Sequence, residues 1–492
     1  MANAPTTSAA MFTPNSGQTA RLPDSLDGTC ISNWDEDLED LGDQEDQEER
    51  EDIEGTQDDQ DKHVKQDEAR PEMNLLAHHA IKHPAHPANT TTSPIFYSSA
   101  QWTADGTTIL TSSSDHTISS FVLPADLLHP SPAGRTLHPQ ATTKLPEPSQ
   151  TLVPAPFFSL GESTSQTFLV GSRDHPLHLY HAFPPDLNSS APLAQYKLIR
   201  HETEQYITPA SLVWPSPGTH FICGSENRLD YFDVSRHGSD GPVLTVPTIP
   251  SKRHITKGHG VGIKGTVSAL AVSPTDSQGG SLVAAGTRTR WMGLYDLHRA
   301  DGAVANWQIS QPDLPGPAGT ASGQGIVQVV WSPCGRYLVI NERRASGLLV
   351  YDIRGSGKLL AVLTGRLANT QQKLTCDVFQ SQDPYRAGGF EVWSGAQDGS
   401  VMVWEDVGFK AAEHDPSWAW NAHSSPVCST ILHPSGSVAA TCSGGWEHLK
   451  DEEQSGAGLR GLHLAQTYKV MEESSLKLWS LHNTNADSDE PI

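Results

Sequence analysis

The sequence predicts an all-β fold in which the strands form a closed ring of seven sheets, a β-propeller. Three recurring features support this prediction: short strands rich in Val, Ile and Leu, small polar turns that contain Asp or Gly, and an aromatic residue near the end of the strand that follows each turn. The seven aromatic residues are Phe121, Tyr180, Phe232, Tyr295, Tyr351, Trp404 and Trp479. A lone four-stranded sheet exposes its edges and one face, and packing against neighbouring sheets in a ring removes that exposure.

The spacing of these copies indicates a repeat of the WD type with insertions. Segments 395–407 (GAQDGSVMVWEDV) and 112–123 (SSSDHTISSFVL) share the same turn and the same outgoing strand. The copies lie further apart than the roughly 40 to 45 residues of a four-stranded WD blade. We therefore predict a seven-bladed WD-repeat propeller over residues 93–482, with surface-loop insertions near 124–156, 309–324 and 443–474.

The two ends of the chain have a different composition. Residues 1–92 are rich in Asp, Glu, Gln, Thr and Pro, and within 35–68 there are 18 acidic residues against three basic ones. This stretch accounts for most of the net charge of −24. Such a segment buries too little apolar area to fold, so we expect residues 1–92 and 483–492 to be disordered. A solubilising tail is the favoured interpretation, and a docking segment for basic partners is the alternative.

Cysteine usage and hydropathy indicate an intracellular, soluble protein. The six cysteines contain no CxxC pair and fall mostly inside expected strands, which is typical of small buried side chains in a reducing compartment. The first residues lack the basic and apolar regions of a signal peptide, and about 18 consecutive apolar residues occur nowhere in the chain.

Motifs for catalysis or cofactor binding fail on their context. GVGIKG at 260–265 fits the spacing GxGxxG, but a strand follows it where a dinucleotide site needs a helix. The phosphate-binding pattern GxxxxGK[ST] is missing from the sequence. His78, His79, His83 and His86 lie between prolines in the expected tail, where no fixed metal geometry is predicted. We therefore expect no cofactor, no metal, no small-molecule substrate and no enzymatic activity.

Basic residues gather in the turns that the strand order places on one face. If each blade runs a, b, c, d from the centre outwards, the b–c turns and d–a loops emerge on the same side. These segments contain the following basic residues: Arg173, Arg228, Arg288, Arg290, Arg343 and Arg344 in the turns, and Arg200, His201, Lys257, His259, Lys264, Arg366 and Lys373 in the loops.

This face is a candidate RNA-binding surface. Arginine can hold phosphate with two hydrogen bonds and stack on an unpaired base. Asn369, Gln371 and Gln372 could recognise base edges, and Trp291, Tyr206 or His259 could stack on bases. The candidate RNA-binding residues are Arg173, Arg200, His201, Lys257, His259, Arg288, Arg290, Arg343, Arg344, Gln371 and Lys373. The alternative is that individual arginines pair with acidic residues of the turns, such as Asp115, Asp174 and Asp398.

One motif suggests a protein partner instead. The run Tyr351, Asp352, Ile353, Arg354 is similar to the W-D-x-R ending of propellers that act as substrate receptors for cullin ubiquitin ligases. The same residues could simply end the strand and pack the blade.

Several stretches together resemble the telomerase Cajal body protein family, WD-repeat proteins that bind small Cajal body RNAs and telomerase RNA. They are 102–118 (WTADGTTILTSSSDHTI), 123–128 (LPADLL), 172–183 (SRDHPLHLYHAF), 331–338 (WSPCGRYL), 369–374 (NTQQKL) and the charged insertion before 476–479 (LKLW). The resemblance extends in order over about residues 93–481.

The resemblance implies a seven-bladed propeller in the nucleus, in Cajal bodies or their equivalent. It implies binding to a loop of a small nuclear or box H/ACA-type RNA, association with core proteins of the ribonucleoprotein, and no membrane. It also implies that Arg173, Arg343, Arg344 and the NTQQK loop lie on the RNA side. A protein-interaction scaffold, either a splicing-associated factor or a ligase receptor, is the alternative function.

Overall fold

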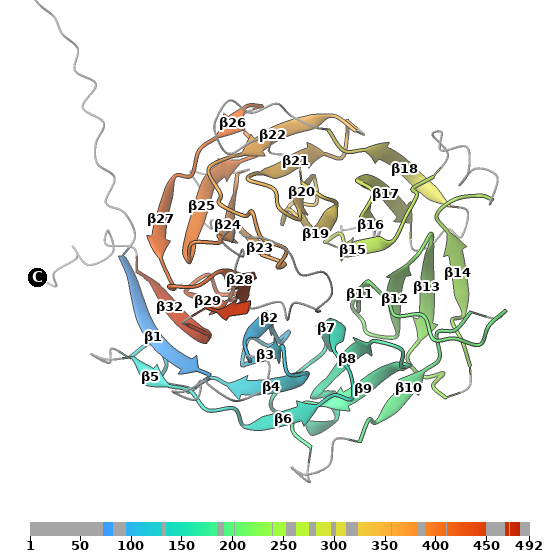
Figure 1. The fold of residues 1–492 in the computed structure, drawn as a ribbon, viewed down its shortest axis with the longest axis horizontal. Helices are drawn as coiled ribbons and strands as arrows, with labels where there is room; N and C mark the ends of the chain where they lie inside the picture. Colours follow the sequence, from blue (N-terminus) through green and yellow to red (C-terminus); the bar gives the residue numbers. More distant parts are fainter. Residues whose placement is uncertain are drawn as a thin grey trace, which may run out of the picture. The chain divides into compact units, whose positions relative to one another are not determined.

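The computed structural model describes residues 72–81, 95–129, 134–184, 191–200, 202–238, 240–251, 262–274, 282–296, 302–310, 323–355, 357–380, 389–409, 411–448, 468–471 and 473–482. Seven sheets of four or five strands are arranged in a ring around a central channel, as Figure 1 shows. The predicted seven-bladed, all-β propeller is therefore confirmed.

Each blade has four antiparallel strands, ordered from the channel to the rim, and two blades have a short fifth strand that pairs in parallel at the rim. The first blade comprises β2 (Tyr97–Trp102), β3 (Thr108–Ser113), β4 (Thr117–Val122) and β6 (Ala141–Lys144). The second comprises β7 (Ser149–Pro154), β8 (Thr167–Ser172), β9 (Leu177–His181) and β10 (Ala194–Tyr196). The third comprises β11 (Ser211–Val213), β12 (His220–Ser225), β13 (Arg228–Asp233) and β14 (Leu244–Pro247).

The next three blades repeat this order. The fourth comprises β15 (Val267–Val272), β16 (Leu282–Thr287), β17 (Trp291–Asp296) and β18 (Ala303–Gln308). The fifth comprises β19 (Ile326–Trp331), β20 (Tyr337–Glu342), β21 (Leu348–Asp352), β22 (Leu359–Leu363) and the added β26 (Glu413–His414). The sixth comprises β23 (Cys376–Phe379), β24 (Phe390–Gly395), β25 (Ser400–Val407) and β27 (Trp418–Asn421).

The seventh blade closes the ring with a strand from the other end of the chain. It comprises β28 (Val427–Leu432), β29 (Val438–Ser443), β32 (Ser475–His482), β1 (Glu72–Ala80) and the short β5 (Arg135–Thr136). β1 pairs antiparallel with β32 from Glu72 opposite His482 to Ala80 opposite Ser475. Backbone hydrogen bonds therefore join the first described strand of the chain to the last.

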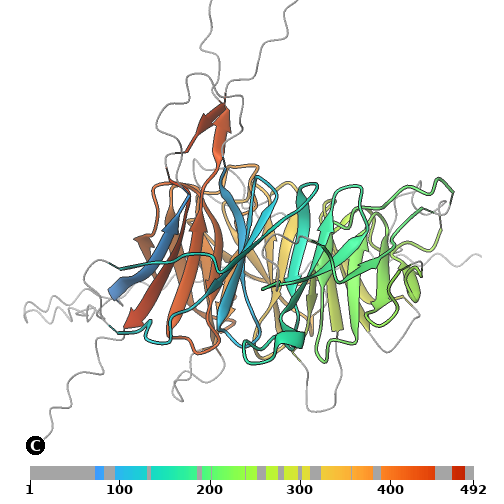
Figure 2. The same cartoon turned by 90° about the horizontal axis from the view of Figure 1, so that it is seen from below.

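The strand order fixes which connections share a face, because successive strands are antiparallel. In every blade the second and third strands meet at a turn on the side where the following innermost strand begins. In the seventh blade this b–c connection contains a hairpin of β30 (Trp446–His448) and β31 (Tyr468–Val470), which Figure 2 shows standing out from the ring. We call this side, with the b–c turns and d–a loops, the upper face.

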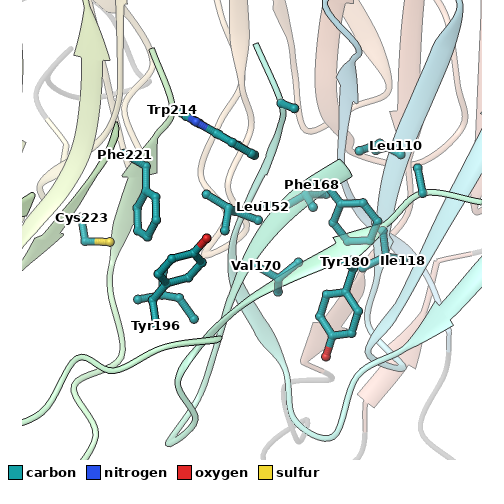
Figure 3. Close-up of a cluster of buried hydrophobic side chains, with 14 of the residues drawn as sticks. Leu110, Ile118, Leu152, Phe168, Val170, Tyr180, Tyr196, Trp214, Phe221 and Cys223 are labelled. Carbon is teal, nitrogen blue, oxygen red and sulfur yellow. The ribbon is translucent and has the colours of Figure 1, made fainter. Parts of the chain in front are cut away.

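The aromatic residues that predicted the repeat all lie in the third strand of their blades and are buried. Larger apolar clusters fill the spaces between blades, as Figure 3 shows for the side chains around Tyr180 and Tyr196. Phe168 stacks on Tyr180 with ring centroids 5.8 Å apart, and Tyr196 meets the edge of Phe221 at 4.9 Å. The first contact lies within the second blade, whereas the second joins β10 of the second blade to β12 of the third, so the two blades stabilise each other.

Two predicted boundaries are wrong. The expected disordered segment, 1–92, includes β1, which is an integral strand of the seventh blade, so the propeller does not begin at residue 93. The expected surface loop at 124–156 contains β5, β6 and β7, of which β6 and β7 are blade strands. Short, polar β6 (ATTK) has no apolar pattern that would have revealed it.

Other sequence predictions fall partly outside the described residues. Most of the insertion at 309–324, the centre of the insertion at 443–474 and the tail at 483–492 lie there. Cys223, Cys376, Cys428 and Cys442 are buried and free, as predicted for structural cysteines, whereas Cys334 is exposed. Among the described residues the only helix is the single 3₁₀ turn Ser163–Ser165, and no helix there is long and apolar enough to cross a bilayer.

Candidate nucleic-acid interface

The predicted basic residues that the structure describes lie on the upper face. Arg173, Arg288, Arg290, Arg343 and Arg344 are in b–c turns, and Arg200, Gln371 and Lys373 are in d–a connections. The remaining candidates, His201, Lys257 and His259, lie outside the described residues. The strand order proposed from the sequence is therefore correct. The candidates differ in their hydrogen-bond and ion-pair partners, which decide whether each side chain is available to a ligand.

Arg290 is a structural residue rather than an exposed cation. Its Nε and Nη2 atoms donate to the carboxylate of Glu342 at 2.7 and 3.1 Å, and Nη2 also donates to the backbone oxygen of Ser310. The Arg290 side chain is 11% exposed and that of Glu342 is 1% exposed. The pair ties the fourth blade to the fifth, so the inclusion of Arg290 among the RNA-binding candidates is not supported by its geometry.

Two further arginines of the upper face have structural partners. Arg228 makes two hydrogen bonds to the fully buried carboxylate of Asp230, both at 2.7 Å. Arg366 is 2% exposed and donates to Asn341 Oδ1 and Ser394 Oγ, at 3.0 and 2.9 Å. Burial lowers its pKa to about 10. Arg366 thus joins the fifth blade to the sixth and is too buried to reach a ligand on the surface, whereas Arg228 is held by a carboxylate of its own strand.

Arg173 and Arg200 have acidic neighbours but remain accessible. Nε of Arg173 lies 3.5 Å from Asp174, and Nη2 of Arg200 lies 3.4 Å from Glu226. All four side chains are more than half exposed. Exposed pairs of this kind contribute little free energy, so both arginines could exchange their partners for phosphate.

A second group of cations converges where the channel opens on the upper face. Arg288, Arg343 and Lys373 line one cavity of about 320 Å³, and Arg343 and Lys373 also line the adjoining channel cavity of about 460 Å³. None of the described residues that line these cavities is acidic. We call the three residues the channel-mouth cations. Within the described part of the chain, none of them has an acidic side chain within ion-pair distance.

The pKa values of these cations reflect their crowding. Burial lowers the pKa of Arg343, and the charge of Arg288 lowers it further. Enclosure by the channel walls lowers the pKa of Lys373, and the charge of Arg343 adds to that effect. The Lys373 side chain is exposed to the open space of the channel, so solvent screens part of this repulsion. An anion at the channel mouth would relieve the repulsion that remains.

The loop before β23 holds the arginines of the fifth blade in place. Nη1 of Arg343 donates to the backbone oxygen of Gln371 at 2.8 Å. Nε and Nη2 of Arg344 both donate to Oδ1 of Asn369, at 2.9 and 2.7 Å. The NTQQK loop and the turn that carries both arginines therefore form one unit, built from side chains whose role as mutual partners the sequence did not indicate.

Apart from Arg343 and Lys373, the described lining of the channel cavity is uncharged and combines apolar side chains with hydroxyl and amide groups. Each of the seven blades contributes residues from its innermost strand or from the segment just before it, among them Ser98, Gln150, Ser211, Ser268 and Gln328. Hydroxyl and amide groups can donate hydrogen bonds to an anion without adding charge. The channel mouth thus has cations on one side, from the fourth blade to the loop before the sixth, and an uncharged wall that offers hydrogen bonds.

A third cavity, of about 470 Å³, shares Lys373 with the two channel cavities, and we call it the amide pocket. Its lining includes the NTQQK loop, Gln397, Phe96, Pro426 and Met471. Asn369, Gln371 and Gln372 were predicted from the sequence to recognise base edges, whereas Phe96 and Met471 were not predicted, because both come from parts of the chain far from this loop. Of the proposed stacking residues, Trp291 packs partly in a core cluster, whereas Tyr206 is 39% exposed.

The other motifs of the sequence have local explanations. Arg354 Nη2 lies 2.6 Å from Asp352 Oδ2, so the two charged residues of the receptor-like run pair with each other. His78 and His79 lie in β1, and Nδ1 of His79 is 2.7 Å from the hydroxyl of Tyr97. Strand β15 follows the GVGIKG run, as expected. Among the described residues no group of three His, Cys, Asp or Glu side chains is placed to hold a metal.

Comparison with known proteins found similar proteins that have different names. The chain is 29% identical over 392 residues to telomerase Cajal body protein 1 of Homo sapiens, covering 78% of this chain and 63% of that protein. It is also 29% identical over 357 residues to telomerase Cajal body protein 1 of Bos taurus, covering 71% of this chain and 58% of that protein. The chain thus spans less than two thirds of the length of these relatives.

A further relative has a different name. The chain is 26% identical over 324 residues to guanine nucleotide-binding protein negative regulator 1 of Schizosaccharomyces pombe, covering 65% of this chain and 73% of that protein. No family model matches the chain.

Proposed function

We propose that this chain, a distant homologue of telomerase Cajal body protein 1, is a non-enzymatic RNA-binding propeller that holds a loop of a small nuclear RNA at the mouth of its channel. The observation that carries the proposal is the presence of Arg288, Arg343 and Lys373 on one cavity without an acidic residue in its described lining. In a chain with a net charge of −24, such a local excess of positive charge needs an explanation.

Phosphate fits this site better than a carboxylate-bearing protein surface does. The guanidinium groups and the ammonium group approach a common space from two blades and a loop, which suits the several oxygens of a phosphate. Phosphate contacts would supply affinity and register, and contacts with base edges would supply sequence preference. Single-stranded RNA loops expose both features together.

The names of the relatives support a more specific proposal. The proteins called telomerase Cajal body protein 1 are named for telomerase and for a nuclear body. We propose a small nuclear or box H/ACA-type RNA as the ligand, core proteins of that ribonucleoprotein as partners, and the nucleus as the location. The accessible Arg173 and Arg200 on neighbouring blades would extend the phosphate contacts, as would His201, Lys257 and His259 from outside the described residues.

Crosslinking in cells tests this proposal. The full-length chain is crosslinked to RNA, purified under denaturing conditions and the attached RNA sequenced. We expect enrichment of a few structured small nuclear RNAs, and crosslinks concentrated in their loops. The Arg343→Ala, Lys373→Ala double variant should lose most of that enrichment at equal expression. Recovery of only abundant RNAs in proportion to their cellular level would contradict the proposal.

A protein-binding regulator is the second candidate function. The relative named as a negative regulator of a guanine nucleotide-binding protein is matched over 73% of its length, a larger share than of the human or bovine telomerase Cajal body protein. This candidate predicts a stable complex with a G-protein subunit that survives nuclease treatment. It also predicts no enriched small RNA, which separates it from the first candidate in one crosslinking experiment.

A further inference from the structure

The amide pocket lies where three parts of the propeller meet on the upper face. The NTQQK loop before β23 forms one wall, Phe96 and Ser98 at the start of the first blade form another, and Met471 at the foot of the β30–β31 hairpin forms a third. Its volume of about 470 Å³ lies within the usual range of small-ligand sites. Met471 directly follows β31, the second strand of the hairpin that stands out from the ring in Figure 2.

Specific contacts hold the walls of the pocket in position. Nε2 of Gln372 donates to the backbone oxygen of Gly444 at 2.9 Å. A Cβ atom at Gly445 would lie 2.4 Å from the amide of Gln372, and one at Gly444 would lie 2.8 Å from Cβ of Phe96. Gly444 also has a φ of +141°, which favours glycine. The two glycines therefore allow the Gln372 amide and Cβ of Phe96 to lie close to the segment that leads into the hairpin.

The pocket combines apolar walls with unused amide groups. Phe96, Pro426 and Met471 provide flat or deformable apolar surface. Gln371 and Gln397 contribute side-chain amides to the lining, and no hydrogen bond of either amide is found among the described residues. An amide presents one donor and one acceptor side by side, which is the pattern that the edge of a nucleobase matches.

The position of the pocket ties it to the channel mouth. Lys373 lines both the amide pocket and the channel cavities, and Gln371, whose backbone oxygen holds Arg343, lines the amide pocket. A ligand that fills the pocket would thus have its neighbouring groups beside two cations. A nucleotide has this arrangement. The flat faces of its base pack on apolar surface, the edge of the base forms hydrogen bonds, and a sugar joins the base to a phosphate. An apolar amino-acid side chain lacks the phosphate.

We infer that the amide pocket receives one unpaired nucleobase of the bound RNA, with its edge against Gln371 and Gln397 and the adjacent phosphate at Arg343 and Lys373. This inference rests on the proposed RNA binding and adds the element that reads sequence. Stacking on apolar or aromatic side chains tolerates all four bases, so the amides provide the preference for one of them. The pocket therefore makes recognition depend on a single loop position.

Selection from a random library tests the inference. RNA hairpins with a constant stem and a randomised loop are selected on the full-length protein and sequenced. We expect one loop position to be dominated by one base, and replacing that base with an abasic residue should weaken binding by about 10-fold or more, as expected from the energy of one stacked, hydrogen-bonded base. The Gln371→Ala, Gln397→Ala double variant should lose the base preference yet keep its salt-dependent affinity.

A matched variant separates loss of the pocket from a general effect of removing amides. Gln195 and Gln308 are exposed glutamines in the outermost strands β10 and β18. Gln195→Ala with Gln308→Ala should select the same base at the same position as the unmodified protein.

The outcomes separate the two proposals. If the protein binds the hairpins but selects no base at any loop position, or if the pocket variant keeps the full preference, the inference is wrong and the RNA-binding proposal stands. If the protein selects no hairpin above the unselected pool at low salt, the proposed function itself fails.

Discussion

Arg290 and Glu342 form a buried ion pair between the fourth and fifth blades, and the residue after Glu342 is the channel-mouth cation Arg343. Two consecutive residues thus have different roles: Glu342 stabilises the contact between blades, and Arg343 is available to a ligand. Glu342 is the last residue of β20 and points its carboxylate at Arg290, whereas Arg343 begins the turn and lines the channel. The arginines of the upper face divide into those that join the strands and blades and those that are available to a ligand.

Replacing Arg290 tests its structural role. Arg290→Ala should lower the stability of the propeller by about 3–5 kcal/mol, because it leaves the buried carboxylate of Glu342 without its charged partner and with only the backbone N–H of Gly323 donating to it. The measurement is chemical or thermal unfolding followed by circular dichroism. Arg288→Ala, two residues away and exposed, serves as the control and should change stability by about 0.5 kcal/mol or less. Equal losses of stability in the two variants would contradict this assignment.

Removal of β1 tests how the ring closes. Leu76 and Ala77 of this strand are buried in the core of the seventh blade, and its whole length pairs with β32. A variant lacking residues 1–81 exposes the edge of β32 together with its apolar neighbours, so we expect a lowered unfolding temperature and aggregation. A variant lacking residues 1–70 keeps β1 and should unfold like the full chain. Matching unfolding temperatures for both truncations would show that β1 is dispensable.

Acidification tests a buried network in the same blade. Nε2 of His423 lies 2.7 Å from Oγ1 of Thr441, which also accepts a hydrogen bond from Nε1 of Trp479 at 2.9 Å, and Nδ1 of His423 lies 3.0 Å from Glu473. Burial lowers the pKa of His423, an effect that outweighs the opposing effect of the hydrogen bond that the ring makes to Glu473. Burial acts to raise the pKa of Glu473, but hydrogen bonds from His423 and Lys477 outweigh it and the pKa is strongly lowered.

The sign of the pH effect follows from these two shifts. A group with a lowered pKa in the folded state stabilises the fold above its unfolded pKa and loses that contribution as the pH falls. The ordinary pKa values are 6.5 for His423 and 4.5 for Glu473, so stability should fall as the pH drops below about 6.5 and fall further below about 4.5. Unfolding temperatures measured from pH 8 to pH 4 test this. His79 and His178 act in the same direction, so His423→Asn should reduce the slope without removing it. A stability that stays level or rises on acidification would be inconsistent with the network.

The fold could be predicted where the signal is local. The aromatic residue of each third strand lies beside its turn in the sequence, and burial of that residue is a property of every blade. β1 could not be predicted in this way, because its partner β32 lies at the other end of the chain and the two pair only when the ring closes. The sequence EMNLLAHHA therefore reads as part of the polar leader until β32 is placed beside it.

The sequence was enough to predict which face of the propeller carries the candidate residues. It was not enough to predict which residues each of them contacts. Antiparallel strand order was enough to place Arg288, Arg290 and Arg343 on the same side. Arg288 and Arg290 are two residues apart in one turn, and which of them meets Glu342 depends on the path of the turn, where Arg290 has a φ of +66°. Phe96 and Met471 join the amide pocket from other blades, and their sequence positions contain no sign of it.

The salt dependence of RNA affinity shows whether the channel-mouth cations Arg343 and Lys373 contact phosphate. Affinity for one selected hairpin is measured over a range of salt concentrations for the unmodified protein and for the Arg343→Ala, Lys373→Ala variant. Loss of two phosphate contacts should weaken binding and reduce the slope of log affinity against log salt by about one to two. Arg173→Ala with Arg200→Ala removes the same charge from exposed pairs on the same face and should have the smaller effect. An unchanged slope in the Arg343 and Lys373 variant would contradict the account.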